Sequence, residues 1–204
     1  MQYQINISID QQSLQQMYMT DENIAFVKHV SSNTSSSSSP VVWVALRPFT
    51  SNTIAWVDSY MLYATTTQVE VGATIEMEAE SGAADIGSAY EFTQLSQFSS
   101  TGNGTAGAIS LANQSAQLKN FGLAQPVMVN GMSEAGPTNI VSLFQNMSTG
   151  FEPSETVALF LSQMYQNGQV ISNIPGNALT ITLSNANSVA NVVYESGTGR
   201  FIEQ

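Results

Sequence analysis

Residues 41–79 read VVWVALRPFTSNTIAWVDSYMLYATTTQVEVGATIEMEA and decide the fold class. This stretch holds both tryptophans of the chain and its most regular alternation of apolar and polar residues. Residues 68–80 alternate throughout, with apolar side chains at every second position and glutamates between several of them. Such alternation places successive side chains on opposite faces of a strand. The stretch therefore predicts the centre of a β-sheet protein.

The same strand pattern continues on both sides of this stretch. Asp10 is suited to cap a short helix over residues 11–19, because aspartate accepts hydrogen bonds from the first free N–H groups of a helix. Residues 152–165 could begin as a helix, but their Thr, Val and Phe content favours a strand. Strands are predicted over residues 3–9, 24–30, 41–47, 53–64, 68–80, 90–92, 108–112, 120–130, 139–144, 156–164, 169–174, 178–183, 189–194 and 200–202.

The second half of the chain resembles a diverged copy of the first. At an offset of 104 residues, Gly72 matches Gly176 and Tyr90 matches Tyr194 without a gap between them. The alternative is that any two all-β sequences can be aligned by choosing gaps. The predicted fold is all-β and β-sandwich-like, with two related halves about a pseudo-twofold axis that share one core or form two. Its predicted parts are half one over residues 1–98 with a serine-rich loop at 31–39, a linker at 99–107 and half two over residues 108–204.

Charge is scarce and mostly negative, which excludes several partners. The formal net charge is −11, and the four fixed cations are scattered along the chain. Nucleic-acid binding needs clustered Lys and Arg, and so does electrostatic attraction to anionic membranes. With no cysteine, disulfides and thiolate metal sites are excluded. The polar surface must consist largely of Ser, Thr, Asn and Gln, which hydrogen-bond readily to sugars, to partners or to other copies.

The sequence shows no apolar run long enough for a transmembrane helix and no signal-peptide pattern in its first residues, MQYQINISID. We therefore expect a soluble protein without a classical signal peptide, either cytoplasmic or released by a non-classical route.

Trp56, Asp58 and Tyr60 form the candidate ligand-binding set. In a continuous strand over residues 53–64 these side chains share one face. Because an aspartate is seldom buried unpaired, this face is predicted to be a groove for a sugar or lipid headgroup, with ordinary core packing as the alternative. Trp43 lies in an apolar run and is predicted to be a core residue.

Glu76, Glu78 and Glu80 form the candidate metal site. On one strand face these carboxylates would follow one another at about 7 Å, an arrangement found on solvated faces or used to hold a hard cation such as Ca²⁺. No other cofactor is expected. The only histidine, His29, lies in an ordinary strand end without a GxSxG motif, so serine-hydrolase chemistry is not predicted.

The sequence favours a non-enzymatic protein that self-associates into a larger assembly. The chain has few lysines that could protect its sheet edges against pairing with another copy. Its amide- and hydroxyl-rich faces also suit repeated contacts in a homo-oligomer. The alternative is a recognition module of the lectin or cytolysin type, toxin-like, that binds a glycan or a lipid headgroup. A carboxylate-based hydrolase is a third hypothesis, because it would need only two well-placed members of the fifteen acidic residues.

Overall fold

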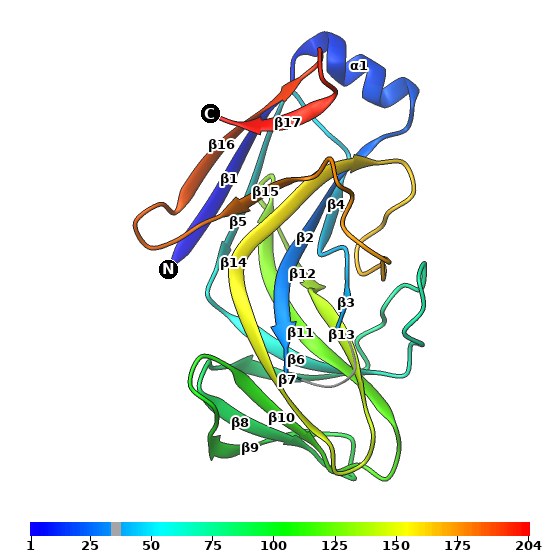
Figure 1. Cartoon of the computed structure of the whole chain (residues 1–204), viewed down its shortest axis with the longest axis vertical. Coiled ribbons are helices and arrows are strands. Elements are labelled where there is room, and N and C mark those ends of the chain that lie inside the picture. Colours follow the sequence, from blue (N-terminus) through cyan, green and yellow to red (C-terminus); the bar gives the residue numbers. More distant parts are fainter. Residues whose placement is uncertain (34–37) are drawn as a thin grey trace.

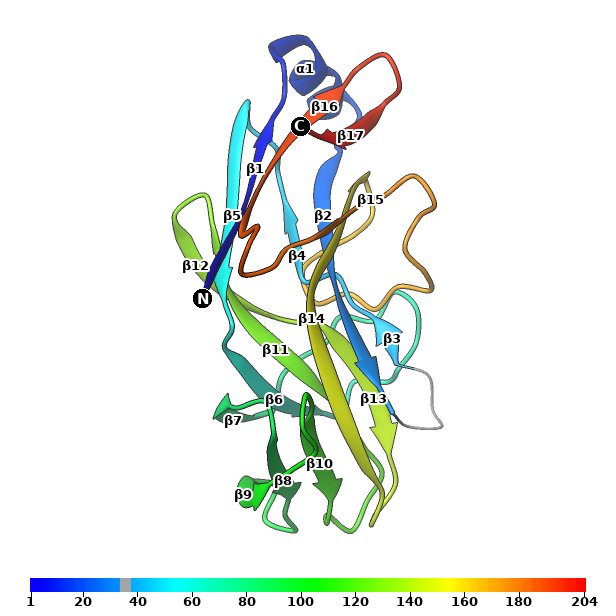
Figure 2. The ribbon, with the colours of Figure 1, turned by 60° about the vertical axis from the view of Figure 1, so that its left-hand side comes forward.

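Strand β1 (Gln2–Ser8) joins distant parts of the chain (Figures 1 and 2). Its alternating apolar residues face inward, and Ile5 and Ile7 are fully buried. β1 pairs in parallel with β16 (Val189–Glu195) and antiparallel with β5 (Ser51–Val57). The computed structural model describes residues 1–33 and 38–204 and has 56% of the chain in strands and 4% in helix. Its two sheets, one of them curled into a half-barrel, confirm the predicted all-β, sandwich-like fold.

The strands divide between two sheets. The first sheet contains β1, β3 (Ser39–Pro40), β5, β6 (Tyr60–Thr65), β7 (Ala79–Ala84), β11 (Lys119–Val129), β12 (Met132–Pro137), β13 (Asn139–Leu143), β16 and β17 (Arg200–Glu203). The second sheet contains β2 (Asn23–Ser32), β4 (Val44–Leu46), β8 (Ser88–Phe92), β9 (Phe98–Asn103), β10 (Ile109–Asn113), β14 (Ser148–Ser162) and β15 (Leu179–Thr182).

The predicted helix is confirmed as α1 (Gln11–Met19). The Asp10 carboxylate accepts hydrogen bonds from the backbone N–H groups of Gln12 and Ser13, both at 2.9 Å. These bonds satisfy two of the free donors at the helix start. Within the described residues no helix is long and apolar enough to span a membrane.

Two apolar cores take side chains from both sheets. The upper core, near the α1 end of Figure 1, includes Trp43 and Trp56, whose ring centroids lie 5.5 Å apart with their planes perpendicular. The lower core, near β8 and β10, includes Phe92 and Phe121, with ring centroids 5.2 Å apart. Trp43 is 1% exposed, as expected of a core residue. Strands β2, β11 and β14 contribute to both cores.

Several predicted strands are corrected. A strand was expected over residues 68–80, but residues 68–78 form none, and only Ala79 and Glu80 belong to a strand, β7. Residues 68–78 have no ladder partner apart from an isolated bridge between Thr74 and Gln169. Its alternation still marks the burial, since Ile75 is buried and Glu76 is exposed. Residues 53–64 form two strands, β5 and β6, because the chain bends at residues 58–59.

Two shorter predictions also need correction. In residues 41–47 only β4 belongs to a named strand, and Val41 makes an isolated bridge to Val170. The strand predicted over residues 169–174 is also absent from the named strands. Among these described residues, the bridges of Val170 to Val41 and of Gln169 to Thr74 are the only strand-like pairing. Both segments are extended chains packed side by side without a full ladder. Residues 152–165, for which a strand was favoured over a helix, lie largely within β14.

The division of the chain into halves is not visible in the sheets. Residues 99–103, predicted as part of a linker, belong to strand β9, which pairs with β8. Strands from before and after this point pair with one another in both sheets, as β1 does with β16 and β2 with β14. The internal duplication is not confirmed, and its offset would match β15 to residues 75–78, which form no strand.

The serine-rich loop predicted over residues 31–39 lies partly outside the described residues. Its described ends belong to the sheets, because β2 extends to Ser32 and β3 begins at Ser39.

The packing predicts that any side chain at position 122 would destabilise the fold. A Cβ built on Gly122 would lie 2.0 Å from the backbone oxygen of Asn139 and 2.7 Å from the Tyr63 ring. We expect Gly122→Ala to lower the free energy of unfolding by about 3 kcal/mol in urea titrations. Gly176→Ala is the matched control, because a Cβ there meets nothing within 4 Å, and it should change stability by less than about 0.5 kcal/mol. Equal stability of the two variants would contradict the packing described.

Candidate functional site

A layer of polar residues separates the two apolar cores. On β2, Phe26 belongs to the upper core and Val30 packs against the lower, and Lys28 lies between them. Gln125 on β11 and Glu155 on β14 likewise lie between residues of the upper core and residues of the lower core. Asp58 occupies the bend between Trp56 of the upper core and Tyr60 of the lower. These four residues, Lys28, Asp58, Gln125 and Glu155, form the polar layer.

A bulge in β14 brings Glu155 into this layer. The register between β14 and β2 shifts between Pro153 and Val157, which gives β14 two more residues than its partner over this stretch. Pro153 has no N–H to donate to a ladder, so it suits a position where the ladder is interrupted. A bulge bends a strand and redirects its side chains, and here it accompanies a glutamate turned toward the interior.

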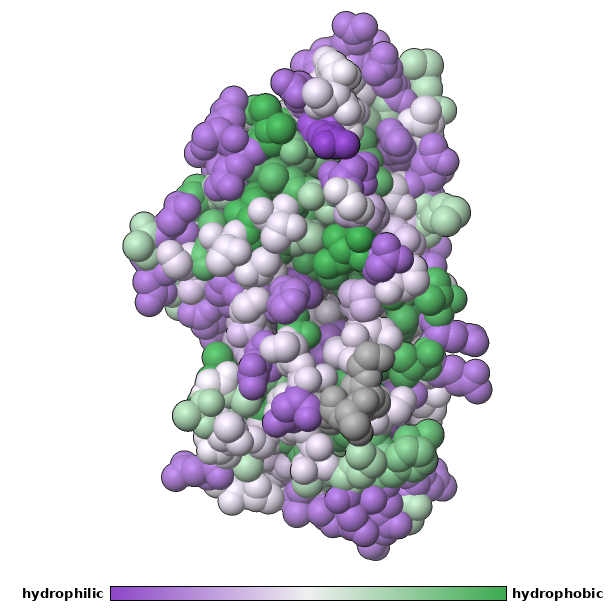
Figure 3. All heavy atoms as spheres, in the orientation of Figure 1, coloured by the Kyte–Doolittle hydropathy of each residue, from purple (hydrophilic) through white to green (hydrophobic). Residues whose placement is uncertain are grey.

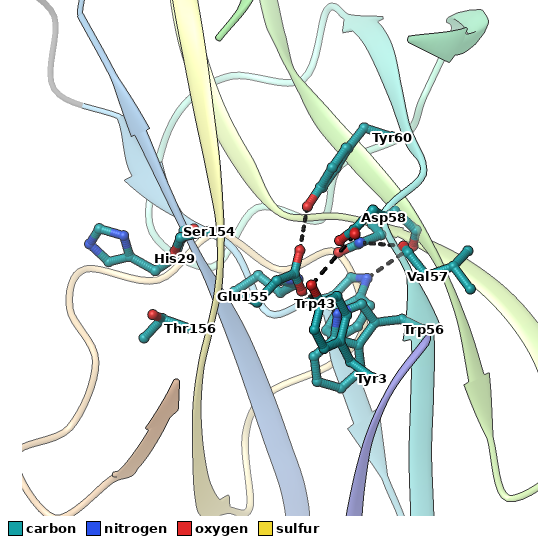
Figure 4. Close-up of polar contacts among 12 residues, drawn as sticks. Tyr3, His29, Trp43, Trp56, Val57, Asp58, Tyr60, Ser154, Glu155 and Thr156 are labelled. Carbon is teal, nitrogen blue, oxygen red and sulfur yellow. Dashed lines mark hydrogen bonds and ion pairs between the residues drawn. The ribbon is translucent and has the colours of Figure 1, made fainter. Parts of the chain in front are cut away.

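The Glu155 carboxylate accepts hydrogen bonds from three side chains of both sheets, and Figure 4 shows the one from Tyr60. Lys28 Nζ lies 2.6 Å from Oε2, and Trp56 Nε1 donates to the same oxygen. The Tyr60 hydroxyl donates to Oε1 at 2.5 Å. Since Trp56 and Tyr60 belong to the first sheet and Glu155 to the second, this single carboxylate joins the two layers.

Lys28 is held between aromatic rings. Its ammonium lies 4.8 Å from the ring centroid of Trp56 and 5.4 Å from that of Trp43, within cation–π range. The residue is 2% exposed. Burial lowers the pKa of Lys28 to about 8, and the neighbouring Glu155 carboxylate opposes this shift.

The same contacts shift the pKa values of the partners. Burial acts to raise the pKa of Glu155, but the ammonium of Lys28 and the hydrogen bonds from Lys28, Tyr60 and Trp56 outweigh it and hold the pKa below its usual value. The pKa of Tyr60 is raised strongly by burial and by its hydrogen bond to Glu155. Lys28 and Glu155 therefore form a charged pair at neutral pH, inside a ring of aromatic side chains.

Asp58 forms the solvent-facing end of the layer. Its side chain is 39% exposed and lies 3.4 Å from the N-terminal amine of Met1. The Tyr3 hydroxyl is 3.5 Å from Asp58 Oδ2 and 3.3 Å from Asn185 Oδ1. Burial and the nearby carboxylate of Asp58 raise the pKa of Tyr3. Asp58 thus ties the start of the chain to the bend between β5 and β6.

Gln125 completes the layer from β11. Its Nε2 donates to the backbone oxygen of Val57 at 2.9 Å, and its own backbone oxygen accepts from Trp43 Nε1 at 3.0 Å. The side-chain Oε1 is buried and has no hydrogen-bond partner within residues 1–33 and 38–204. An unpaired buried acceptor costs about 1–3 kcal/mol, so the gain from the Val57 bond is partly offset.

The structure brings the predicted residues Trp56 and Tyr60 together, but not on one strand face. They lie on β5 and β6, are each 3% exposed, and meet through Glu155. Asp58 is the exposed member of the set. The predicted groove over these three residues is therefore filled by Glu155 and Lys28, and ligand binding there stays a prediction.

The structure does not gather the predicted metal ligands Glu76, Glu78 and Glu80. Glu78 accepts hydrogen bonds from the backbone N–H and the hydroxyl of Thr66 and lies 3.8 Å from Lys119 Nζ. These contacts, led by the hydroxyl bond, lower the pKa of Glu78. Across the described part of the chain no three His, Cys, Asp or Glu side chains converge in a way that could hold a metal ion.

Two residues near the layer face away from it. Figure 4 shows His29 and Ser154 on the opposite side of β14 from Glu155, and the Ser154 hydroxyl donates to the backbone oxygen of His29 at 3.0 Å. The carboxylate of Glu155 is engaged by three donors, which leaves it a weak base. The hydrolase hypothesis gains no pair of free carboxylates from this geometry.

Sequence reasoning missed Lys28, Gln125 and Glu155. A lysine within the apolar run of residues 24–30 was the one available signal, because it interrupts a strand whose neighbours are buried. Glu155 gave none, since the acidic residues of 152–155 fit a helix entry or a solvated strand equally well. No protein-family model, curated protein or solved structure matches the chain.

Removal of only one charge from the Lys28–Glu155 pair is predicted to lower the free energy of unfolding strongly. We expect Glu155→Gln to lower the free energy of unfolding at pH 7 by about 3 kcal/mol, because Lys28 stays buried without its counter-charge. The double variant Lys28→Met with Glu155→Gln should recover at least half of that loss, since no buried charge remains. Urea unfolding of the three proteins tests this, and a double variant no more stable than the single one would contradict it.

Lys28 also predicts a stability that rises with pH. Between pH 8 and 10 the unfolded chain keeps the Lys28 proton while the folded chain, with a pKa of about 8, has largely released it. The Lys28 proton alone should therefore raise stability by about 2 kcal/mol across this window in the wild type. The tyrosines with raised pKa values, such as Tyr3 and Tyr60, offset part of this gain near pH 10, because the unfolded chain loses their protons first. Lys28→Met should lack this contribution, so the difference between the two pH profiles measures it. Parallel pH profiles of the two proteins would refute the assignment.

Proposed function

We propose that the protein is non-enzymatic and self-associates through strand β9, a free edge of its second sheet. This one observation carries the proposal: β9 ends the sheet order, and its residues from Ser99 to Asn103 are all exposed. A sheet edge presents unpaired backbone donors and acceptors that can pair with another chain.

The backbone of β9 is oriented for such pairing. Thr93 N–H donates to Gln97 O at 2.9 Å, which makes this the first hydrogen-bonded pair of the β8–β9 hairpin. Antiparallel ladders alternate, so the backbone groups of Phe98 and Ser100 point away from β8. Within the described residues these outward groups have no backbone hydrogen bond.

The chemistry around β9 removes the usual barriers to pairing. No charged residue occurs between Phe92 and Leu118, although the whole chain carries a net charge of −11. Figure 3 shows this region, at the lower left over β8 and β9, largely in the pale colours of residues near neutral hydropathy. Copies that meet along β9 therefore bring together strands without charged residues, and the nearest charge in the pairing is Glu91 of β8, opposite Ser99.

Three other strands at sheet edges, β17, β3 and β4, are better protected. Strand β17 carries Arg200 and Glu203, and β3 contains Pro40, which has no backbone donor. On β4 the Ala45 N–H donates to Asn167 Oδ1 at 2.5 Å, so this edge is partly covered. Two copies joined through β9 in antiparallel fashion would satisfy a twofold axis, the commonest symmetry of homo-oligomers.

The alternative of a lectin- or cytolysin-type recognition module at Trp56, Asp58 and Tyr60 has less support. Trp56 and Tyr60 are buried and bonded to Glu155, so neither ring offers a face to a ligand.

A proline on the edge tests the proposal. We expect the wild-type chain to exceed its monomer mass of 21.8 kDa in light scattering as concentration rises, and Ser100→Pro to stay at that mass. Proline removes the outward N–H without removing a bond to β8. Ser100→Ala is the matched control, because it keeps the N–H and should associate like the wild type. A wild type that remains a monomer at all concentrations would rule the proposal out.

A further inference from the structure

A polar hollow of about 400 Å³ lies on the second sheet, beside the free edge. It spans β8, β9, β10 and the start of β14, and no charged side chain is among its lining residues. Side chains along these strands alternate, and those of Ile109 and Leu111 belong to the lower core. Ser110 and Ala112 lie at the intervening positions of β10, so they face outward into the hollow.

Glycines shape the hollow. A Cβ on Gly150 would lie 3.2 Å from Asn33 Nδ2, and one on Gly104 would lie 2.9 Å from Ser110 Oγ. The missing side chains let Asn33 approach the backbone of β14, where Gly150 N–H donates to Asn33 Oδ1 at 2.6 Å. This bond orients the Asn33 amide at the rim.

The lining offers several unused hydrogen-bonding groups. Ser110 Oγ accepts from Thr105 N–H at 3.2 Å, and its hydroxyl hydrogen is left for another acceptor. The hydroxyls of Thr101, Thr105 and Ser148 and the Nδ2 of Asn33 have no hydrogen-bond partner within residues 1–33 and 38–204. Hydroxyl and amide groups both donate and accept, which matches a ligand that carries many hydroxyls of its own.

The ligand class follows from these groups and from the charge. An anionic ligand finds no cation in the lining and is repelled by the net charge of −11, and a cation finds no carboxylate there. The side chains of Ala89 and Ala112 give the floor an apolar component that suits the C–H face of a sugar ring. We propose that this hollow binds a neutral, polyhydroxylated ligand, namely an uncharged sugar residue.

The site lies within one chain, so sugar binding does not depend on self-association through β9. It also differs in place from Trp56, Asp58 and Tyr60, none of which lines it.

The test is a titration of amide NMR shifts with the methyl glycosides of glucose, galactose, mannose and N-acetylglucosamine at millimolar concentration. At least one should shift the amides of Ser110, Ala112 and Ser148, and glucuronate should not. Ser148→Ala should weaken that binding roughly three- to tenfold, as expected for one hydrogen bond. Ser133→Ala, on β12 of the first sheet, is the matched control and should leave the affinity unchanged.

Ala112→Leu fills the hollow and should abolish the shifts; Ser148→Ala decides the question if that variant does not fold. The proposal is overturned if none of the four glycosides shifts these amides, or if glucuronate binds as well as they do. Binding that is unaffected by Ser148→Ala and by Ala112→Leu would also overturn it.

Discussion

The buried ion pair of Lys28 and Glu155 is the interaction on which the arrangement of the two sheets depends. Burying two charges costs several kcal/mol for each ion unless both are paired and hydrogen-bonded. Here the cost is offset by donors from Trp56 and Tyr60 and by the two tryptophan rings around the ammonium. These groups come from both sheets, so the charges are satisfied only when the sheets have one relative position.

The polar layer also explains why the upper and the lower core are separate. Strands such as β11 and β14 are long enough to pass through both, and a continuous apolar face on each would allow the sheets to slide along one another. The polar layer places a polar side chain between the two cores on each of these strands. Because these polar groups must meet their partners, only one register between the two sheets is allowed. The hypothesis that buried polar groups give specificity at some expense of stability fits the orphaned oxygen of Gln125.

Much of the fold was predictable from the sequence because strand alternation depends on local residues. The α1 helix and its Asp10 cap, the buried Trp43, and most strands after residue 108 follow from patterns within a few residues. The segment 68–78 shows the limit: its alternation reports burial correctly, but strand formation needs a partner ladder, which no local pattern encodes. The polar layer could not be predicted for the same reason, since Lys28 and Glu155 lie 127 residues apart and meet only through a bulge.

The parallel pairing of β1 with β16 has a consequence for the synthesis of the chain on the ribosome. β1 is made before its partner β16, whose residues 189–195 are translated on the order of ten seconds or more later at typical elongation rates. Until then the side of β1 that pairs with β16 has no strand partner. The first sheet can therefore be completed only after translation has passed this point, and a nascent chain stalled before it would expose an unpaired, apolar strand to chaperones or to other nascent chains.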